Sequence, residues 1–362
     1  MTHLFWRISL GILKKIPQRS FRDRDHLRTK DGLYFTVVGN VHPSDRIIAY
    51  LKYYPNFNGG KVKNRVLKRA IKHYNVPNII KTIEILEKKY PHYITPLEPY
   101  GFNFSAVPIE YLEEHFLPEK KLLELLETKN QDVLSQKAAN LALRLSKECK
   151  LSIGNFGITG SILIGIHNPI FSDIDITVYG KESSIKVKET LLEIFKKNDE
   201  KIRRANGEFL STIKKRFPYL NEKELKIFYQ RKWNRGTFEG RFFSINPVRT
   251  EKETREKYGD LNYIQLDIVE IKAKVEDSSE NMFIPAIYRV DNVNIIKGPN
   301  ISGIEEIVSY DRNYGDVAEY GEKIICKGKL EKVIDNRINK THYRVTIGSL
   351  KAKGTDYLKI NV

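Results

Sequence analysis

The chain has 362 residues, 41% of them hydrophobic and 30% charged, a composition typical of a globular protein and unlike that of a disordered one. Lysine plus arginine number 62 against 45 aspartate plus glutamate, and the net charge of +17 favours a polyanionic partner such as RNA or DNA over a merely basic surface. Two distant cysteines and eight scattered histidines exclude a disulfide framework and a zinc-finger pattern, so a cytoplasmic protein is expected.

Length and the amino terminus set the broad organisation. A chain of this size has room for two or three domains. The first twenty residues contain an apolar run that Arg7 interrupts; the run is too short to span a bilayer and lacks a small-residue cleavage site. We expect a core segment or a docking helix there, with a signal peptide as the alternative, and no membrane association.

Residues 1–130 are predicted to form an N-terminal β/α segment. Its last helical stretch is broken at Pro118. His115 falls in that stretch, where a half-buried helix histidine is the expected role. The predicted elements are strands over 33–41 and 46–54 and helices over 62–73, 77–90 and 108–128.

A helix over 131–149 is the clearest element of the sequence. Its apolar residues recur with a period close to 3.6, which is typical of a helix with one face in the core. A short strand, IGNFGIT, follows it, and another helix is expected over 183–197. The apolar positions are Val133, Leu134, Ala138, Leu141, Leu145 and Cys149.

The stretch 156–180 carries the most specific chemical signal. It holds Gly160 and Ser161, then a spacer, then Asp173-Ile-Asp175-Ile. Side chains alternate faces along a strand, so the two aspartates are expected on one face with the isoleucines in the core. Adjacent carboxylates repel unless a cation lies between them, and Mg²⁺ prefers such oxygen ligands together with substrate phosphates. Taken alone, an Asp-x-Asp pair is more often an ordinary exposed strand edge.

The Gly-Ser pair, the spacer and the Asp-x-Asp strand together resemble the signature of the DNA polymerase beta nucleotidyltransferase superfamily. The general layout resembles a group of predicted archaeal nucleotidyltransferases, with the specific likeness covering residues 133–275. The resemblance implies an α+β fold whose core, over 131–280, is a mixed sheet with helices. It also implies transfer of a nucleoside monophosphate from a nucleoside triphosphate to an acceptor hydroxyl, with release of pyrophosphate.

The resemblance also implies roles for single residues. Asp173 and Asp175 would bind Mg²⁺, while Gly160 and Ser161 would contact the triphosphate at a helix N-terminus. The superfamily carries a third carboxylate on a later strand of the same sheet, and Asp267, within a predicted strand over 263–275, is assigned to it. The three aspartates would then bind two Mg²⁺ ions, with Mn²⁺ as a substitute, and act as the catalytic residues.

Residues 201–257 form a basic segment with 16 lysines and arginines against 7 glutamates and with aromatic residues interleaved. Basic side chains neutralise phosphates and aromatic faces stack bases, so contact with the triphosphate or with nucleic acid is expected from a few of these residues. Lys232 and Arg241 are the candidates for the triphosphate. For most of the segment, solvated helix faces are the simpler interpretation.

From residue 281 to 362 the sequence predicts a small all-β domain, either a sandwich or a barrel such as the OB fold. The function expected from the whole sequence is Mg²⁺-dependent nucleotidyl transfer to an RNA or DNA acceptor. Two alternatives stay open: an inactive nucleotidyltransferase fold that serves as a nucleic-acid-binding scaffold, and transfer to a protein or small molecule. The sequence does not identify the nucleotide, the acceptor, the number of additions or the oligomeric state.

Overall fold

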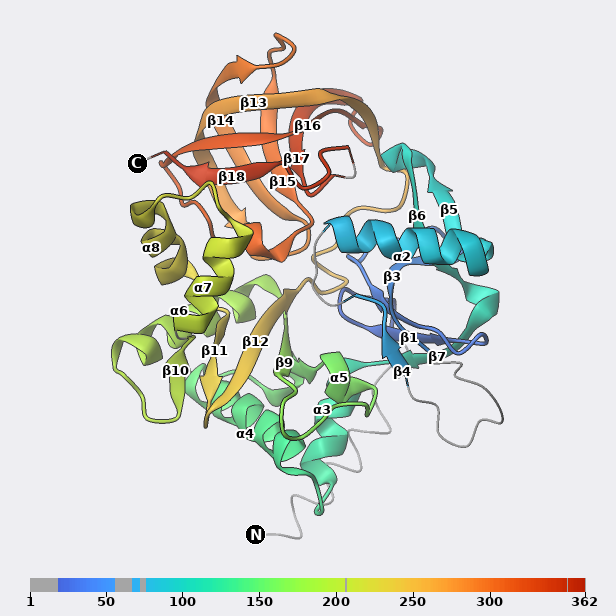
Figure 1. Cartoon of the computed structure of the whole chain (residues 1–362), viewed down its shortest axis with the longest axis vertical. Helices are drawn as coiled ribbons and strands as arrows, with labels where there is room; N and C mark the ends of the chain where they lie inside the picture. The colour runs from blue at the N-terminus through green and yellow to red at the C-terminus, as the bar shows by residue number, and fades with distance from the viewer. Residues whose placement is uncertain (1–18, 56–66, 72–75, 206, 350, 362) are drawn as a thin grey trace. The chain divides into compact units, whose positions relative to one another are not determined.

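The computed structural model describes residues 19–55, 67–71, 76–205, 207–349 and 351–361 (Figure 1). The chain divides into two compact units that are each built from separated stretches, unlike the three consecutive segments expected. Unit 1 comprises residues 1–27, 114–217 and 232–254, and unit 2 comprises residues 28–113, 218–231 and 255–362.

Unit 1 contains a five-stranded sheet in the order β10-β11-β12-β9-β8. All neighbours are antiparallel except β9 and β12, which are parallel although far apart in sequence. Most side chains of β9 are buried, which fits its run of β-branched residues. The strands are β8 (Phe156–Ile158), β9 (Ile174–Tyr179), β10 (Ile202–Arg204), β11 (Arg235–Phe238) and β12 (Arg241–Val248).

Two long helices, one before and one after the stretch 156–180 in sequence, pack against strand β9 of this sheet. The helix expected over 131–149 is confirmed as α4 (Val133–Glu148), and Asp132 caps it by accepting hydrogen bonds from two backbone amides. The helix expected over 183–197 is confirmed as α6 (Lys181–Lys196). Figure 1 shows α3 and α4 beside the strands of this unit. The other α-helices in the described part of unit 1 are α3 (Pro118–Glu127), α5 (Gly160–Leu163) and α7 (Gly207–Arg216).

Unit 2 includes most of a seven-stranded sheet in the order β5-β6-β3-β2-β1-β7, with β4 paired to β3. The strands expected over 33–41 and 46–54 are confirmed as β2 and β3, and the helix over 77–90 as α2. The elements are β1 (His26–Thr29), β2 (Tyr34–Val37), β3 (Arg46–Pro55), β4 (Leu67–Arg69), α2 (Val76–Lys89), β5 (Ile94–Leu97), β6 (Phe102–Pro108) and β7 (Leu112–Phe116).

One helix prediction in this part is wrong in the described residues, and another is confirmed only in its second half, as α3. The helix over 62–73 meets strand β4 at its centre, while much of the rest of that stretch lies outside the described residues. The helix expected over 108–128 begins only at Pro118, because residues 112–116 pair with β1 as the edge strand of the sheet. A pairing partner far away in sequence outweighs local helical preference at both places.

The carboxyl-terminal region is all β, as predicted. Its strands β13, β14, β15, β17 and β16 form a continuous path that closes where β16 pairs with β13, and β18 adds to β16. Within this path only β15 and β17 run parallel. The strands are β13 (Leu261–Glu280), β14 (Ala286–Lys297), β15 (Ile304–Ser309), β16 (Lys323–Asp335), β17 (Lys340–Ile347) and β18 (Tyr357–Ile360). Helix α8 (Glu222–Arg231) precedes this region in the chain and belongs to the same unit.

A buried cluster of charges lies between β16 and β17 in this region. Glu331 binds both Lys329, at 2.6 Å, and Arg344, at 2.7 Å, and all three side chains are at most 6% exposed. The guanidinium of Arg344 also lies 3.7 Å from the ring centroid of Tyr263 on β13. One carboxylate thus serves two buried cations, with an aromatic face completing the shell.

The α+β class is therefore confirmed, with an all-β carboxyl-terminal region. Among the described residues, no helix combines the length and the apolar character that a bilayer crossing needs.

Candidate functional site

Gly160 and Asp175 are packed against one another at the start of α5. The backbone amide of Thr159 donates to the carbonyl of Asp175 at 2.9 Å, which joins β8 to β9 at this point. Gly160 has φ +71°, and a Cβ added there would overlap Oδ2 of Asp175. Glycine is therefore required both by the backbone conformation and by the closeness of the carboxylate.

A polar row crosses the sheet from Asp175. In register, Asp175 on β9 is paired with Ser244 on β12, and Ser244 is paired with Arg235 on β11. Directly paired residues share a face of the sheet, so all three side chains lie on one side. The Ser244 hydroxyl donates to Oδ1 of Asp175 at 2.5 Å. Asn246 donates to the Ser244 oxygen at 3.0 Å and to the carbonyl of Ile176 at 3.0 Å, which fixes the hydroxyl.

The two oxygens of the Asp175 carboxylate thus face different neighbours, Ser244 at Oδ1 and Gly160 at Oδ2. This holds the carboxylate in one orientation, as a metal ligand requires.

Arginine side chains converge on the same centre. Burial lowers the pKa of Arg235; the carboxylates of Asp175 and Asp173 oppose this, while the nearby charges of Arg24 and Arg216 lower it further. The two aspartates and the two other arginines thus act on Arg235 in opposite directions, and Arg24 itself lies 3.5 Å from Asp23. A polyphosphate would relieve the mutual repulsion of these cations.

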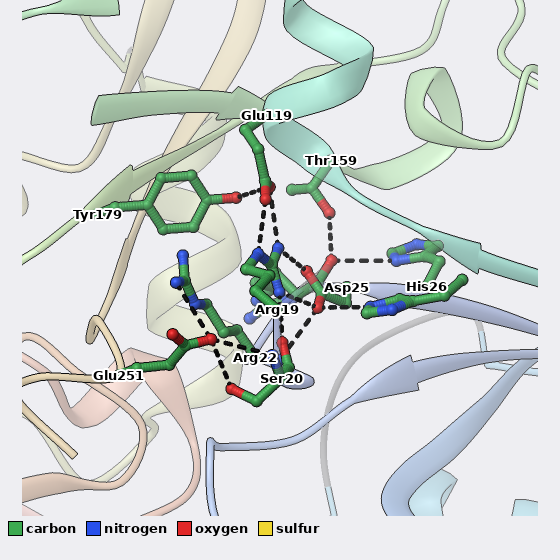
Figure 2. A network of polar contacts seen from close by, with 11 residues as sticks. Arg19, Ser20, Arg22, Asp25, His26, Glu119, Thr159, Tyr179 and Glu251 are labelled. Carbon is green, nitrogen blue, oxygen red and sulfur yellow. Dashed lines mark hydrogen bonds and ion pairs between the residues drawn. The ribbon is translucent and has the colours of Figure 1, made fainter. Parts of the chain in front are cut away.

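Arg24 reaches this centre from the amino-terminal segment. Its carbonyl accepts a hydrogen bond from the hydroxyl of Thr159, at 2.8 Å, and Thr159 is the residue immediately before Gly160. The segment that contains Arg24 is itself fixed by a buried ionic network (Figure 2).

In that network Arg19 forms paired hydrogen bonds with Asp25, at 2.7 and 2.8 Å, and with Glu119 of α3, at 2.5 and 2.9 Å. His115 adds a third contact to Asp25, at 2.8 Å, and Tyr179 at the end of β9 donates to Glu119 at 2.8 Å. The side chain of Asp25 is fully buried and that of Arg19 is 6% exposed. The expected helix histidine at 115 is instead a strand residue that binds this carboxylate.

Asp173 lies just before β9 and is exposed, whereas Asp175 is half-buried. The described residues contain no group of three or more histidine, cysteine, aspartate or glutamate side chains arranged to hold a metal. Two carboxylates alone still fit Mg²⁺, which commonly takes one or two carboxylates and completes its shell with water and substrate phosphates. The donor set therefore fits one such ion at Asp173 and Asp175.

The expectation that Asp267 lies on the sheet of Asp175 is wrong. Its strand, β13, pairs with β14 and β16 in the six-stranded sheet of unit 2. Asp267 falls at a register shift between Gln265 and Ile268, its side chain is 81% exposed, and it binds Lys351 at 2.7 Å. This contact lowers the pKa of Asp267. The strand beside β9 is β12, which presents Ser244 where the carboxylate was expected.

Lys232 and Arg241, the two basic residues expected to bind the triphosphate, are buried or bound to backbone carbonyls. Lys232 is 5% exposed, and its carbonyl accepts a hydrogen bond from Arg204. Arg241 donates to the carbonyls of Ile170, at 2.5 Å, and Pro169, at 3.3 Å. Several other cations of the basic segment are likewise engaged: Lys201 binds Glu239, Arg231 binds Glu322, and Arg204 lies over the ring of Phe195.

The sequence predicts no role for Ser244 and distinguishes Arg235 only as one cation of the basic segment, although a signal for their pairing exists. Glu239 and Gly240 form a two-residue turn with φ +46° and +76°, and Phe238 pairs directly with Arg241. Positive φ at both positions is typical of a type I′ hairpin, and a glycine-containing pair between alternating strands predicts one.

Comparison with known proteins finds a related sequence but no family model and no solved structure. A protein of Methanocaldococcus jannaschii, described as uncharacterized protein MJ1086, is 31% identical over 350 residues, which cover 94% of this chain and 98% of the relative.

Proposed function

This chain belongs to the same family as the archaeal protein MJ1086, and we propose that it is a metal-dependent nucleotidyltransferase. The observation that carries the proposal is the packing of Gly160 against the oriented carboxylate of Asp175. A glycine there lets the backbone that leads into Ser161 approach a carboxylate that would bind the metal, and a phosphate could then contact both. The proposal includes a polymerase-beta-like core in unit 1, for which the mixed five-stranded sheet and the Gly-Ser and Asp-x-Asp spacing are the support.

The reaction would move a nucleoside monophosphate to a hydroxyl group. The acceptor oxygen bonds to the α-phosphorus, the bond from that phosphorus to the bridging oxygen breaks, pyrophosphate leaves and the hydroxyl proton passes to water. Asp173 and Asp175 would hold Mg²⁺, which supplies charge neutralisation of the phosphates. Ser161 would contact the triphosphate through its hydroxyl and amide. The helix that contains it, α5, has only four residues, so a helix dipole adds little there.

Arg235 replaces Lys232 and Arg241 as the main triphosphate residue of the proposal. It lies in the row with Ser244 and Asp175, and the charges of Asp175 and Asp173 both raise its pKa. Its guanidinium can offer two parallel donors to phosphate oxygens.

We favour a nucleic acid as the acceptor. We also favour the cytoplasm as the location of the protein. The net charge of +17 supports a polyanion. The closed five-strand path of unit 2 agrees with an OB-like barrel, a fold that often binds oligonucleotides. Both cysteines, Cys149 and Cys326, are free and buried, in keeping with a reducing compartment.

A nucleic-acid-binding scaffold with an inactive core is the second candidate. The position of Ser244 favours it, because a hydroxyl stands where a third carboxylate was expected. Incubation with labelled nucleoside triphosphates, Mg²⁺ or Mn²⁺, and RNA or DNA separates the two. Labelled acceptor that disappears in Asp173→Asn and Asp175→Asn supports the enzyme; salt-sensitive nucleic-acid binding without pyrophosphate release supports the scaffold.

A further inference from the structure

The loop between α5 and β9 ends in an exposed apolar tip. Ile170 is 79% exposed and Phe171 is 73% exposed, and among the described large hydrophobic residues only Tyr320 reaches a similar value. The tip is separated from Asp173 by a single residue, Ser172. An exposed aromatic and aliphatic pair so close to a carboxylate centre is costly in water unless something covers it.

The tip is held in place by polar contacts on several sides. Arg241 donates to the carbonyl of Ile170, whose own amide donates to the side chain of Asn168 at 2.8 Å. The amide of Asn168 donates to the hydroxyl of Ser172 at 2.9 Å. His167 contacts Asp132, the cap of α4, at 2.9 Å.

These contacts fix the backbone that carries the tip without covering its side chains. A preorganised apolar surface costs less ordering entropy on binding, so the arrangement suits a ligand that packs flat against it.

The charged residues near the tip indicate which kind of ligand would pack against it. Arg235 lies in one row with the half-buried Asp175 and is acted on by the charges of Arg24 and Arg216, a positive environment that suits the triphosphate. The attacking hydroxyl of the acceptor must arrive from solvent. Asp173 is the exposed carboxylate of the pair, and it lies two residues after Phe171 in the sequence. A phosphodiester chain drawn by the same positive charge would bring its bases to this side.

We propose that Phe171, supported by Ile170, stacks on the unpaired terminal nucleobase of a nucleic-acid acceptor. Base stacking on an aromatic ring is tolerant of sequence and needs only an exposed, fixed face. The proposal rests on the proposed function for its placement of the acceptor. It makes Phe171 a substrate-binding residue and Arg241 a positioning residue that holds the loop.

The test is a binding measurement that does not depend on turnover. RNA and DNA hexamers with a 3′-terminal 2-aminopurine, whose fluorescence falls on stacking, are titrated with the full chain and with Phe171→Ala and Phe171→Trp. We expect the alanine variant to bind about tenfold more weakly without the fall in fluorescence, and the tryptophan variant to behave as wild type. Leu143→Ala, an exposed apolar side chain of α4 in the same unit as Phe171, is the control and should change nothing.

A fluorescent nucleoside triphosphate supplies the second arm. Its affinity should be the same in wild type and Phe171→Ala; a loss there with unchanged hexamer binding would assign the tip to the incoming base and overturn the proposal. Hexamer binding or fluorescence that Phe171→Ala leaves unaltered, or a wild-type chain that binds no hexamer, would also overturn it. If Phe171 governs stacking but no transfer occurs with any nucleotide, the enzyme assignment fails and the base-stacking site stands.

Discussion

Gly160 lies so close to Asp175 that any side chain at position 160 would enter the space of the carboxylate. The contact joins the Gly-Ser pair to the Asp-x-Asp strand, two features that the sequence separates by a spacer. It also makes the role of the glycine testable apart from its backbone conformation.

Gly160→Ala should lower nucleotidyl transfer by at least a hundredfold, because displacing the Asp175 carboxylate by a fraction of an ångström misaligns the reacting groups. Gly165 supplies the matched control, since it has φ +68° and nothing within 4 Å of an added Cβ. Both alanine variants should lose about 1 kcal/mol of stability from the positive φ. Thermal unfolding and turnover are measured for both; equal activity in the two variants contradicts the contact.

Ser244→Ala should reduce the turnover number about tenfold by releasing the Asp175 carboxylate from its hydrogen bond. Ser244→Thr keeps a hydroxyl and should recover most of the activity. Steady-state kinetics with saturating Mg²⁺ measure the effect. A serine that only filled space would make the alanine variant as active as wild type.

Arg235→Gln should weaken nucleoside triphosphate binding about tenfold or more, as expected for a lost charge-assisted hydrogen bond. Lys201→Gln is the control, because Lys201 is 61% exposed and pairs with Glu239 on the surface. Equilibrium binding of a nonhydrolysable triphosphate at two salt concentrations gives both affinities. Equal affinities in the two variants would remove Arg235 from the site.

Asp267→Asn should leave both metal-dependent transfer and triphosphate affinity at the wild-type level. Asp267 lies on a different sheet from Asp175, is exposed and is bound to Lys351, so it is not among the residues of the proposed centre. The same assay with Asp173→Asn, which should be inactive, supplies the contrast. Loss of transfer in the Asp267 variant would restore it as a third catalytic carboxylate.

Acid should unfold the chain partly through Asp25. Burial raises the pKa of this carboxyl, but hydrogen bonds and charges from Arg19 and His115 outweigh burial and leave it below its usual value. The stabilisation is therefore complete above the unfolded pKa of about 3.9 and is lost as the pH falls below it. Asp25→Asn should cost about 3 to 5 kcal/mol at pH 7, since it leaves Arg19 buried with Glu119 alone, and should flatten the acid limb.

Denaturant unfolding of wild type and Asp25→Asn between pH 3 and pH 7 checks this. Glu182→Gln is the control in the same unit, because that side chain is 83% exposed and pairs only with Lys186 on the surface of α6. An Asp25 variant that keeps the wild-type slope below pH 4 would show that other groups govern acid unfolding.

Much of the fold is readable in the sequence because local pattern and final structure agree. The period of α4, the β-branched run of β9 and the all-β carboxyl-terminal region each follow from residues that are close together. The errors arise where partners are distant. Residues 112–116 look helical but pair with β1, and β13 looks like a core strand but belongs to another sheet.

The candidate site, too, is predictable only where its residues lie close together in the sequence. Gly160 and Asp175 are found from spacing because one short segment carries both. Ser244 and Arg235 join them only through the parallel pairing of β12 with β9 and the hairpin with β11, and no local pattern specifies which strand lies beside which. Asp267 is an acid in an apolar strand, a pattern that predicts a strand but does not specify the sheet to which the strand belongs.

The parallel pairing of β9 and β12 has a consequence during synthesis. Asp175 leaves the ribosome well before Ser244, which follows 69 residues later. Until the β11–β12 hairpin has emerged and docked, the nascent chain carries its carboxylates without the hydroxyl and guanidinium beside them. Closing such distant contacts is slow compared with forming local helices. The polar row of Asp175, Ser244 and Arg235 is therefore completed late in the maturation of unit 1, and a chain interrupted before β12 has the motif without the row.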